Sequence, residues 1–460
     1  MIRTLSARLL LTSIFTLSLS TPSFAYHATQ GITLAQVTDD VSYLASDELQ
    51  GRGNFSAEIG KAADYIAKRF ADNGLKNASG ISANNFLQHY NIIKITPTKL
   101  NLSLNGKEIA ADQLAIASTL EQLSWNIDNK ASIAKAKFTL HTVSKDDDMR
   151  ATLSKLNHQG GQHLVLLNSA HADLFKRYQS YFGRGLTKLA NATSDNGGAI
   201  VIALTDFTAS QINTLSLTSV NTKSNHELTN VVAVLPGKSK PEEIVLYSAH
   251  YDHLGVKNSQ DNSDNIYNGA DDDASGTAAV INLAQHFAKQ GKNERTLMFA
   301  AFSAEEIGGF GSKYFSKQLV PSKITAMINI EMIGKPSKFG AGSIWMTGME
   351  RSSLGEQLNN ALAKTGEQIH QDPYPEQGLF YRSDNATLAR LGVPAHSFSS
   401  TQLDKDQHYH KASDDVASLD LKSLHKVIQA LATATQPLVD GTITPSRIDV
   451  NKVKGKGLIY

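Results

Sequence analysis

The spacing of hydrophobic and polar residues divides the chain into regions of different texture. Between residues 32 and 75, apolar residues recur every three or four positions, which predicts two amphipathic helices. Residues 86–115 alternate between apolar and polar, as strands do, and Asn105-Gly106 is typical of a hairpin turn. Residues 116–226 carry short apolar runs after Gly-Gly pairs, which indicates a smaller inserted α/β or β-rich unit with its own core.

From residue 229 onward, continuous apolar runs alternate with helical patterns. Such runs are typical of strands that are buried on both faces of a sheet. The alternation predicts an α/β fold with a mostly parallel central sheet flanked by helices. The strands are expected at 231–235, 244–249, 297–302 and 324–330, and the helices from about Ser275, at 351–366 and at 421–438.

These textures predict a division of the chain into five segments. Two of them, separated in sequence by the inserted unit, are expected to form one main domain. The last segment, of twenty residues, contains four cationic residues, and we expect it to form a loose tail. The segments are 1–25, 26–115, the insert at 116–226, 227–440 and the tail at 441–460.

The first 25 residues have the three parts of a secretory signal peptide. Arg3 and Arg8 form a basic start, an apolar stretch follows, and Ser23-Phe24-Ala25 is a small-x-small cleavage pattern. The apolar stretch is shorter than the roughly 20 residues that a membrane span needs. The sequence therefore predicts cleavage after Ala25 and an exported protein, periplasmic or extracellular, with no membrane span.

Composition narrows the possible chemistry. The 460 residues include 44 Lys and Arg against 43 Asp and Glu, a net charge of +1, which gives no basic surface for nucleic acid. The chain has no cysteine, which excludes disulfides, thiolate metal sites and a cysteine nucleophile. Any metal must therefore be held by His, Asp and Glu side chains, and 15 His are available.

Metal-type side chains follow several of the predicted buried strands. In an open α/β sheet, ligands bind at the carboxyl ends of the strands. His250 ends one strand, and Asp252 is placed to accept its other ring N–H, although an ordinary buried His–Asp pair explains this motif equally well. The acidic run Asp271-Asp272-Asp273 crowds negative charge that a cation would relieve, and it lacks the alternate spacing of an EF-hand loop.

Three further positions complete the set. Glu305-Glu306 follows a strand, and two adjacent carboxylates can divide the roles of metal ligand and general base. Glu331 ends another buried strand, where an unpaired acid is costly. Spacing alone does not choose between His408 and His410 in the loop before the last helix. Together these positions supply two His and at least three carboxylates, enough for two metal ions bridged by one carboxylate.

In this order the motifs resemble those of the M28 family of zinc-dependent aminopeptidases. The similarity runs from the segment Leu44 to Arg52 to the helix after Asp415, and the region 116–226 lies where many members carry a protease-associated insert domain. The resemblance implies a catalytic zinc peptidase domain and two zinc ions per chain. It implies metal binding by His250, Asp272, Glu306, Glu331 and His410, with Asp272 bridging.

The resemblance also implies roles for the remaining residues. Ser275 sets the register that selects Asp272, and Ser413-Asp414 selects His410. Glu305 is implied as the general base that acts on a metal-bridged hydroxide, and Asp252 as the residue that orients His250. The implied substrates are peptides with a free N-terminus; the oligomeric state is left open.

Two departures from the family pattern stand out. Glu331 takes the place of the usual Asp, and Ser383-Asp384-Asn385 replaces a Ser-Asp-His segment that we expect to line the substrate side. Alternatives stay open at this stage. They are a zinc carboxypeptidase-type relative, with Arg382 holding a substrate carboxylate, a glutaminyl-cyclase-type relative with one zinc, and a non-catalytic binding receptor.

Overall fold

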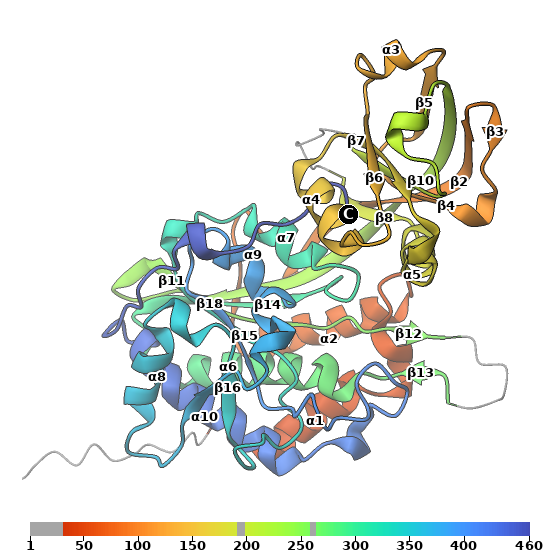
Figure 1. The fold of residues 1–460 in the computed structure, drawn as a ribbon. Coiled ribbons are helices and arrows are strands. Elements are labelled where there is room, and N and C mark those ends of the chain that lie inside the picture. Colours follow the sequence, from red (N-terminus) through yellow and green to blue (C-terminus); the bar gives the residue numbers. More distant parts are fainter. Residues whose placement is uncertain (1–30, 191–197, 258–263) are drawn as a thin grey trace, which may run out of the picture.

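The computed structural model describes residues 31–190, 198–257 and 264–460. The predicted signal peptide lies outside the described residues. Two units are visible in Figure 1: a larger body and a smaller unit, inserted between residues of the larger one, that stands at its upper right. None of the helices in the described ranges is long and apolar enough to cross a membrane.

A 12-stranded mixed sheet runs through the larger body and continues into the inserted unit (Figure 1). Its four central strands, β18, β15, β11 and β14, are parallel, as the sequence predicts, whereas β10 and β2 continue the sheet in antiparallel pairing. The spatial order is β17 (Ile369–Gln371), β16 (Ile344–Met346), β18 (Ala395–Ser399), β15 (Ile324–Ile330), β11 (Lys240–His250), β14 (Arg295–Phe302), β10 (Leu215–Leu235), β2 (Leu87–Leu104) and β3 (Lys107–Glu108). The short strands β1 (Lys76–Asn77), β5 (Gln122–Ile127) and β8 (Leu186–Leu189) pair beside this path.

Helices cover both faces of the central strands, which explains why the strands read as continuous apolar runs. Along β14, Leu297 and Phe299 belong to one core cluster, and Met298 and Ala300 belong to the cluster on the opposite face. The first cluster is completed by α1 (Leu34–Leu44), α2 (Glu58–Asp72), α6 (Gly276–Gln290), α8 (Leu354–Leu362) and α10 (Leu421–Val439). The second is completed by α7 (Phe310–Ser316) and α9 (Asn385–Ala389). The helices and strands predicted for these regions are confirmed, with ends that differ by a few residues.

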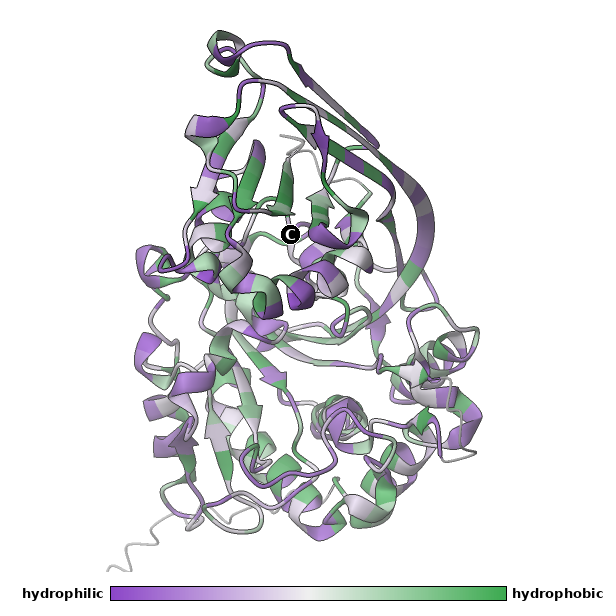
Figure 2. Cartoon of the chain, turned by 45° about the vertical axis from the view of Figure 1, so that its right-hand side comes forward, coloured by the Kyte–Doolittle hydropathy of each residue, from purple (hydrophilic) through white to green (hydrophobic). Residues whose placement is uncertain are grey.

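The inserted unit has its own four-stranded sheet, in the order β4 (Leu114–Ser118), β9 (Ala199–Leu204), β7 (Gln162–Leu167) and β6 (Thr139–Val143). The hydrophobic β7 and β9 stand out in Figure 2, and α4 (Met149–Gln159) and α5 (Ala172–Gly183) pack on one face. A short α3 (Lys130–Ile133) lies at the top of the unit in Figure 1. The hairpin expected at Asn105-Gly106 is present between β2 and β3.

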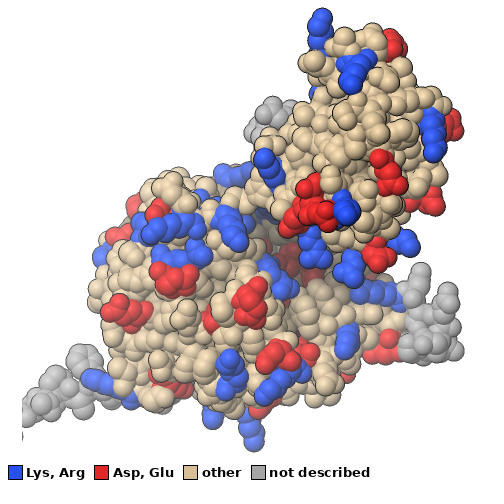
Figure 3. Space-filling model, in the orientation of Figure 1, with Lys and Arg blue, Asp and Glu red and all other residues tan. Residues whose placement is uncertain are grey.

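The structure places the joins between the units inside strands. The predicted boundary at 115/116 falls within β4, and the one at 226/227 falls within β10, which runs from the inserted unit into the main sheet. The division of the chain into domains stays a prediction. On the face shown in Figure 3, a hollow separates the two units, and acidic side chains lie in its depth.

The C-terminal segment is not the loose tail that its composition indicates. Ile459 is 3% exposed and belongs to the core of the inserted unit. The side chain of Asn157 accepts the backbone N–H groups of Ile459 and Tyr460, and its amide donates to the Tyr460 carbonyl. The last residues therefore fasten the inserted unit to the chain end, because apolar side chains among the lysines find a core there.

Candidate metal centre

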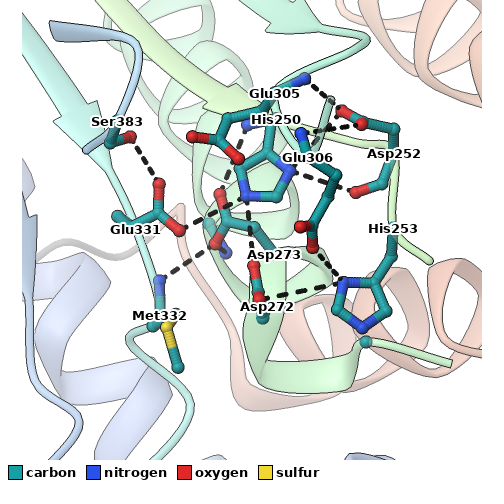
Figure 4. A network of polar contacts seen from close by, with 12 residues as sticks. His250, Asp252, His253, Asp272, Asp273, Glu305, Glu306, Glu331, Met332 and Ser383 are labelled. Atoms are coloured by element: carbon teal, nitrogen blue, oxygen red, sulfur yellow. Dashed lines mark hydrogen bonds and ion pairs between the residues drawn. The ribbon is translucent and has the colours of Figure 1, made fainter. Parts of the chain in front are cut away.

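The predicted site residues meet at the carboxyl edge of the parallel strands (Figure 4). His250 is the last residue of β11, and Glu331 directly follows β15. Glu305 and Glu306 lie in the turn after β14, and Asp272 lies in the turn that leads into α6. His410 comes from the loop between β18 and α10. Neighbouring parallel strands end side by side, so residues up to 160 positions apart in sequence share one edge.

His250, Asp272 and Glu331 form the first group of facing ligand atoms. Nε2 of His250 lies 3.1 Å from Oδ1 of Asp272 and 3.3 Å from Oε1 of Glu331. His250 is 1% exposed and Asp272 is 3% exposed. The Glu331 carboxylate thus faces the His250 ring with Oε1, and its Oε2 accepts a 2.6 Å hydrogen bond from Ser383.

A second group lies on the other side of Asp272. Nε2 of His410 is 3.2 Å from Oδ2 of Asp272 and 3.3 Å from Oε2 of Glu306. Each oxygen of Asp272 therefore faces a different imidazole, as a bridging carboxylate requires. His408 instead lies on the surface of the same loop, where its Nδ1 is 3.1 Å from the Ser413 hydroxyl. The structure brings together all five predicted ligands; that they bind metal stays a prediction.

The sequence reading missed His253. This side chain is 1% exposed, and its Nδ1 lies 2.8 Å from Oε1 of Glu306 and 3.8 Å from Oδ2 of Asp272. These three residues form a group of possible ligands in their own right. The signal was present in the sequence, since His253 directly follows Asp252, but nothing in the local pattern shows on which side of the strand end it lies.

The three residues of the acidic run Asp271-Asp272-Asp273 differ in their hydrogen-bond partners. Asp273 accepts the backbone N–H groups of Gly276 and Met332 at 3.0 Å each. Asp271 accepts from the Gly334 N–H at 2.7 Å and the Thr401 hydroxyl at 2.6 Å. These two carboxylates therefore tie loops together, and only Asp272 turns its oxygens toward the imidazoles. Ser275 supports this arrangement by donating to the Asp271 carbonyl.

The turn after β14 sends adjacent carboxylates in different directions. Figure 4 shows the Glu305 carboxylate turned toward the side of Glu331, and the Glu306 carboxylate turned toward His253. Ala304 has a φ of 60° at the start of this turn. Met332 and His410, each beside or at a candidate ligand, also have positive φ values of 51° and 58°. Non-glycine residues rarely adopt this conformation, and such residues concentrate at functional sites.

Asp252 has a different set of partners from the one expected. Nδ1 of His250 lies 3.0 Å from the backbone carbonyl of Asp252 and 3.6 Å from its carboxylate, which is too long for a hydrogen bond. The carboxylate instead accepts the backbone N–H groups of Glu305 and Glu306, at 3.1 and 3.2 Å, and the Asn54 amide at 2.6 Å. Asp252 therefore holds the Glu305-Glu306 turn against the end of β11, and its backbone holds the His250 ring.

Arg52 is a buried cation behind the centre. Its side chain is fully buried and donates to the carbonyls of Leu44, Tyr251, Asn268 and Gly269. Burial lowers the pKa of Arg52 to about 10, although the surrounding aspartates oppose the shift. The guanidinium thus stays charged and fixes the two loops that carry His250 and Asp272. This explains the use of the segment from Leu44 to Arg52, which the sequence reading noted without a role.

The segment 383–385 only partly lines the substrate side. Ser383 borders the cavity beside Glu331, as expected. Asp384 is 2% exposed, and Asn385 is fully buried, with its amide donating to the Phe380 and Ala395 carbonyls. The expectation that Asn385 faces substrate is therefore wrong, because its side chain is hydrogen-bonded to backbone carbonyls in the core.

The acids at the centre carry opposite pKa shifts. Burial raises the pKa of the Glu305 carboxyl well above its ordinary value, and the nearby Glu331 adds to the effect while His250 opposes it. Burial also raises the pKa of Asp384 to about 7. For Asp272, burial is outweighed by hydrogen bonds to His250 and His410, which hold its pKa well below the ordinary value. Within one centre the surroundings therefore lower the pKa of Asp272 and raise the pKa of Glu305.

A cavity of about 240 Å³ opens beside the centre. Asp272, Glu305, Glu331 and His410 form one side of it. The apolar residues Trp345 and Leu379 also line the cavity, and they belong to a small cluster with Tyr374. The other lining residues include Met332, Thr347, Gln377, Arg382, Ser383, Ser397, Ser399, Leu403, Asp406, Gln407, Tyr409 and Lys411.

Comparison with known proteins identifies relatives of the larger body. The model of peptidase family M28 matches residues 230–435. Leucine aminopeptidase 1 of Ajellomyces dermatitidis is 29% identical over 205 residues, which cover 42% of this chain and 52% of the relative. The chain spans about half or less of the length of the curated relatives it matches.

Two solved structures share the fold. An aminopeptidase from Aneurinibacillus sp. strain AM-1 superposes with a TM-score of 0.53 at 17% identity, over 94% of this chain and 97% of that one. A zinc aminopeptidase from Bacillus subtilis superposes with a TM-score of 0.51, also at 17% identity, over 92% and 99% of the two chains. The α/β architecture predicted from the sequence is therefore confirmed.

Proposed function

Since residues 230–435 of this chain match the model of peptidase family M28, we propose that the protein is an exported aminopeptidase that holds two zinc ions. It would hydrolyse the first peptide bond of peptides with a free N-terminus. The observation that carries this proposal is the meeting of five candidate ligands around both oxygens of Asp272, at the edge of a cavity.

The spacing of the ligand atoms fits zinc. Ligands at about 2.0–2.1 Å from a tetrahedral zinc lie about 3.3 Å from one another. The four N–O distances around Asp272, between 3.1 and 3.3 Å, agree with this value. Imidazole and carboxylate are also the ligands that open, hydrolytic zinc sites use. His250, Asp272 and Glu331 would hold one ion, and Asp272, Glu306 and His410 would hold the other.

Zinc, when bound, supplies Lewis acidity and lowers the pKa of a bound water. The chain itself supplies the proton transfer. Glu305 borders the cavity, and its raised pKa suits a group that takes a proton from the attacking water and gives it to the departing amine. Asp252 keeps Glu305 in place by accepting its backbone N–H.

The cavity favours a peptide that enters by its amino end. Among the lining residues, the carboxylates of Glu305 and Glu331 suit a positively charged α-amine, and Trp345, Met332 and Leu379 suit an uncharged first side chain. A cavity of about 240 Å³ has room for a large side chain. We therefore propose a preference for large apolar N-terminal residues, in keeping with the leucine aminopeptidase among the relatives.

The decisive experiment is a substrate panel with and without a metal chelator. Leucine, phenylalanine and glutamate amides would be compared with peptides blocked by acetyl at the amino end or by amide at the carboxyl end. We expect cleavage of leucine and phenylalanine amides, tolerance of a C-terminal amide, no cleavage after N-acetylation, and loss of activity in chelator that zinc restores.

The same panel separates the alternatives. Cleavage that needs a free carboxylate would favour a carboxypeptidase, for which Arg382 borders the cavity. Cyclisation of N-terminal glutamine with one zinc per chain would favour a cyclase. Binding of peptides without turnover of any substrate would favour a receptor.

Export is proposed from residues 1–25 alone. Their basic start, apolar stretch and small-x-small end predict cleavage after Ala25. Intact-mass measurement of protein recovered from the periplasm or medium should give a chain that begins at Tyr26. Full-length protein confined to the cytoplasm would overturn the proposal. The inserted unit is proposed as a protease-associated-type domain on its position in the chain.

A further inference from the structure

His253 occupies a fully enclosed position in the centre that none of the roles above uses. Its Nδ1 faces Oε1 of Glu306 at 2.8 Å, and it lies 3.8 Å from Oδ2 of Asp272. The ring of His410 stands nearly edge-on to it, with 5.8 Å between ring centroids. Figure 4 shows the imidazole turned with this nitrogen toward Glu306 and Asp272.

Hydrogen bonding does not account for this placement. Among the described residues, neither ring nitrogen of His253 has a hydrogen-bond partner, and neither does Oε1 of Glu306. The two atoms lie in a 2.8 Å ion-pair contact that does not have the geometry of a hydrogen bond. Buried polar atoms without partners are costly and uncommon. A nitrogen and a carboxylate oxygen that face each other without a hydrogen bond are placed as two ligands of one cation.

The surroundings hold the ring in this place. The backbone N–H of His253 donates to the Arg52 carbonyl at 3.2 Å. Gly269 lies against the ring with a φ of +57°, and a Cβ at that position would come within 2.4 Å of Cγ of His253. Gly269 therefore provides both the left-handed backbone and the space that the imidazole needs.

We propose that Nδ1 of His253 is a fourth protein ligand of the metal held by Asp272, Glu306 and His410. The inference rests on the proposed two-zinc function and deepens it. The two sites are then unequal. The site of His250, Asp272 and Glu331 has three protein ligands and keeps a position open, whereas the site of His253 is closed by two imidazoles and two carboxylates.

This inequality has a consequence for the division of labour. Four protein ligands hold a zinc ion more tightly than three, and they leave less room for a substrate atom. The ion at the closed site would stay bound, and its positive charge would compensate the carboxylates of Asp272 and Glu306. The open site, which shares the cavity with Glu305, is the one that receives the substrate.

Zinc binding, measured apart from catalysis, tests the inference. Full-length apoprotein would be titrated with zinc in competition with a chelator of known affinity, giving one dissociation constant per site. We expect two constants in the wild type, and we expect His253→Ala to weaken the tighter one at least tenfold and to leave the weaker one within twofold. His408→Ala is the matched control and should change neither, because His408 contacts Ser413 on the loop.

The outcomes separate the inference from the function beneath it. Two zinc ions in the wild type with unchanged constants in His253→Ala would overturn the inference alone. A single zinc ion in the wild type would overturn the two-metal function as well. If His253→Ala does not fold, zinc-edge X-ray absorption of wild-type protein loaded with one equivalent decides. Two imidazole ligands support the inference, and one imidazole overturns it.

Discussion

In the ranges that the structure describes, two sheets have parallel strands that end side by side, and one of them ends in candidate metal ligands. In the main sheet, β11, β14 and β15 lead into His250, Glu305 and Glu331. In the inserted sheet, β6, β7 and β9 are likewise parallel. Their carboxyl ends also carry polar residues, such as Asn168 and Asp206.

The polar residues of the inserted sheet satisfy one another. Asp206 accepts hydrogen bonds from the Asn168 amide at 3.0 Å and the Ser169 hydroxyl at 2.9 Å. Asp147 accepts the backbone N–H of Ser144 at 2.7 Å. These carboxylates are at the surface, where water serves their remaining lone pairs. The turns at the end of this sheet therefore have their polar groups satisfied by hydrogen bonds or by solvent.

In the main sheet the polar groups converge in a buried place and remain incomplete. The ring nitrogens of His253 and Oε1 of Glu306 lack hydrogen-bond partners within the described part of the chain. The acids also outnumber the buried cations Arg52 and Lys335 that compensate them from behind. In both sheets, the carboxyl ends of parallel strands gather polar residues. Buried polar groups without hydrogen-bond partners are what indicates that a ligand binds there.

Removing the shared carboxylate should have the largest effect. Asp272→Asn keeps the shape of the side chain and removes the charge that faces both His250 and His410. We expect zinc content, measured by mass spectrometry of the metal, to fall below one ion per chain, and peptidase activity to fall by more than the 10- to 100-fold typical of losing an outer partner. Two retained zinc ions would contradict the bridging role.

Removing the proposed base should leave the metals in place. Glu305→Gln preserves the volume of the side chain and its backbone hydrogen bond to Asp252. Turnover should fall by about 10²- to 10⁴-fold, the usual contribution of a general base, with zinc content and thermal midpoint unchanged. Near-normal turnover in steady-state assays would show that another group accepts the proton.

The chain end should matter for the inserted sheet and not for the centre. Ile459→Ala removes a side chain that is 3% exposed in the core of that unit. We expect a loss of about 2–4 kcal/mol in the free energy of unfolding of the inserted unit, measured by denaturant titration, with normal zinc content. An unchanged midpoint would mean that the tail does not stay docked.

The smallest effect on stability and activity is expected at the turn after β9 of the inserted sheet. Asp206→Asn is the same chemical change as Asp272→Asn, made on an exposed carboxylate. It should alter the free energy of unfolding by about 1 kcal/mol or less and should leave zinc content and turnover at wild-type values. A marked loss of activity would give the inserted sheet a role in catalysis.

Much of the architecture could be predicted from the sequence because its signals are local. Continuous apolar runs identified the buried strands, and the 3.6-residue period identified α1, α2, α8 and α10. The position of His250, Glu306 and Glu331 after strands placed these candidate ligands at one edge, and the family resemblance added Asp272 and His410. The tail could not be predicted, since Ile459 and Tyr460 find their core some 300 residues away in sequence, at Asn157.

The sequence by itself determined the residue types of the centre and the strand ends that carry them, because strand periodicity and the absence of cysteine are properties of the chain. Only the tertiary structure decided what each side chain faces. It gave Asp271 and Asp273 their backbone hydrogen-bond partners, moved Asp252 from the His250 ring to the Glu305 turn, and brought His253 against Glu306. Direction and burial arise from loops that meet across long sequence distances, and no local pattern encodes them.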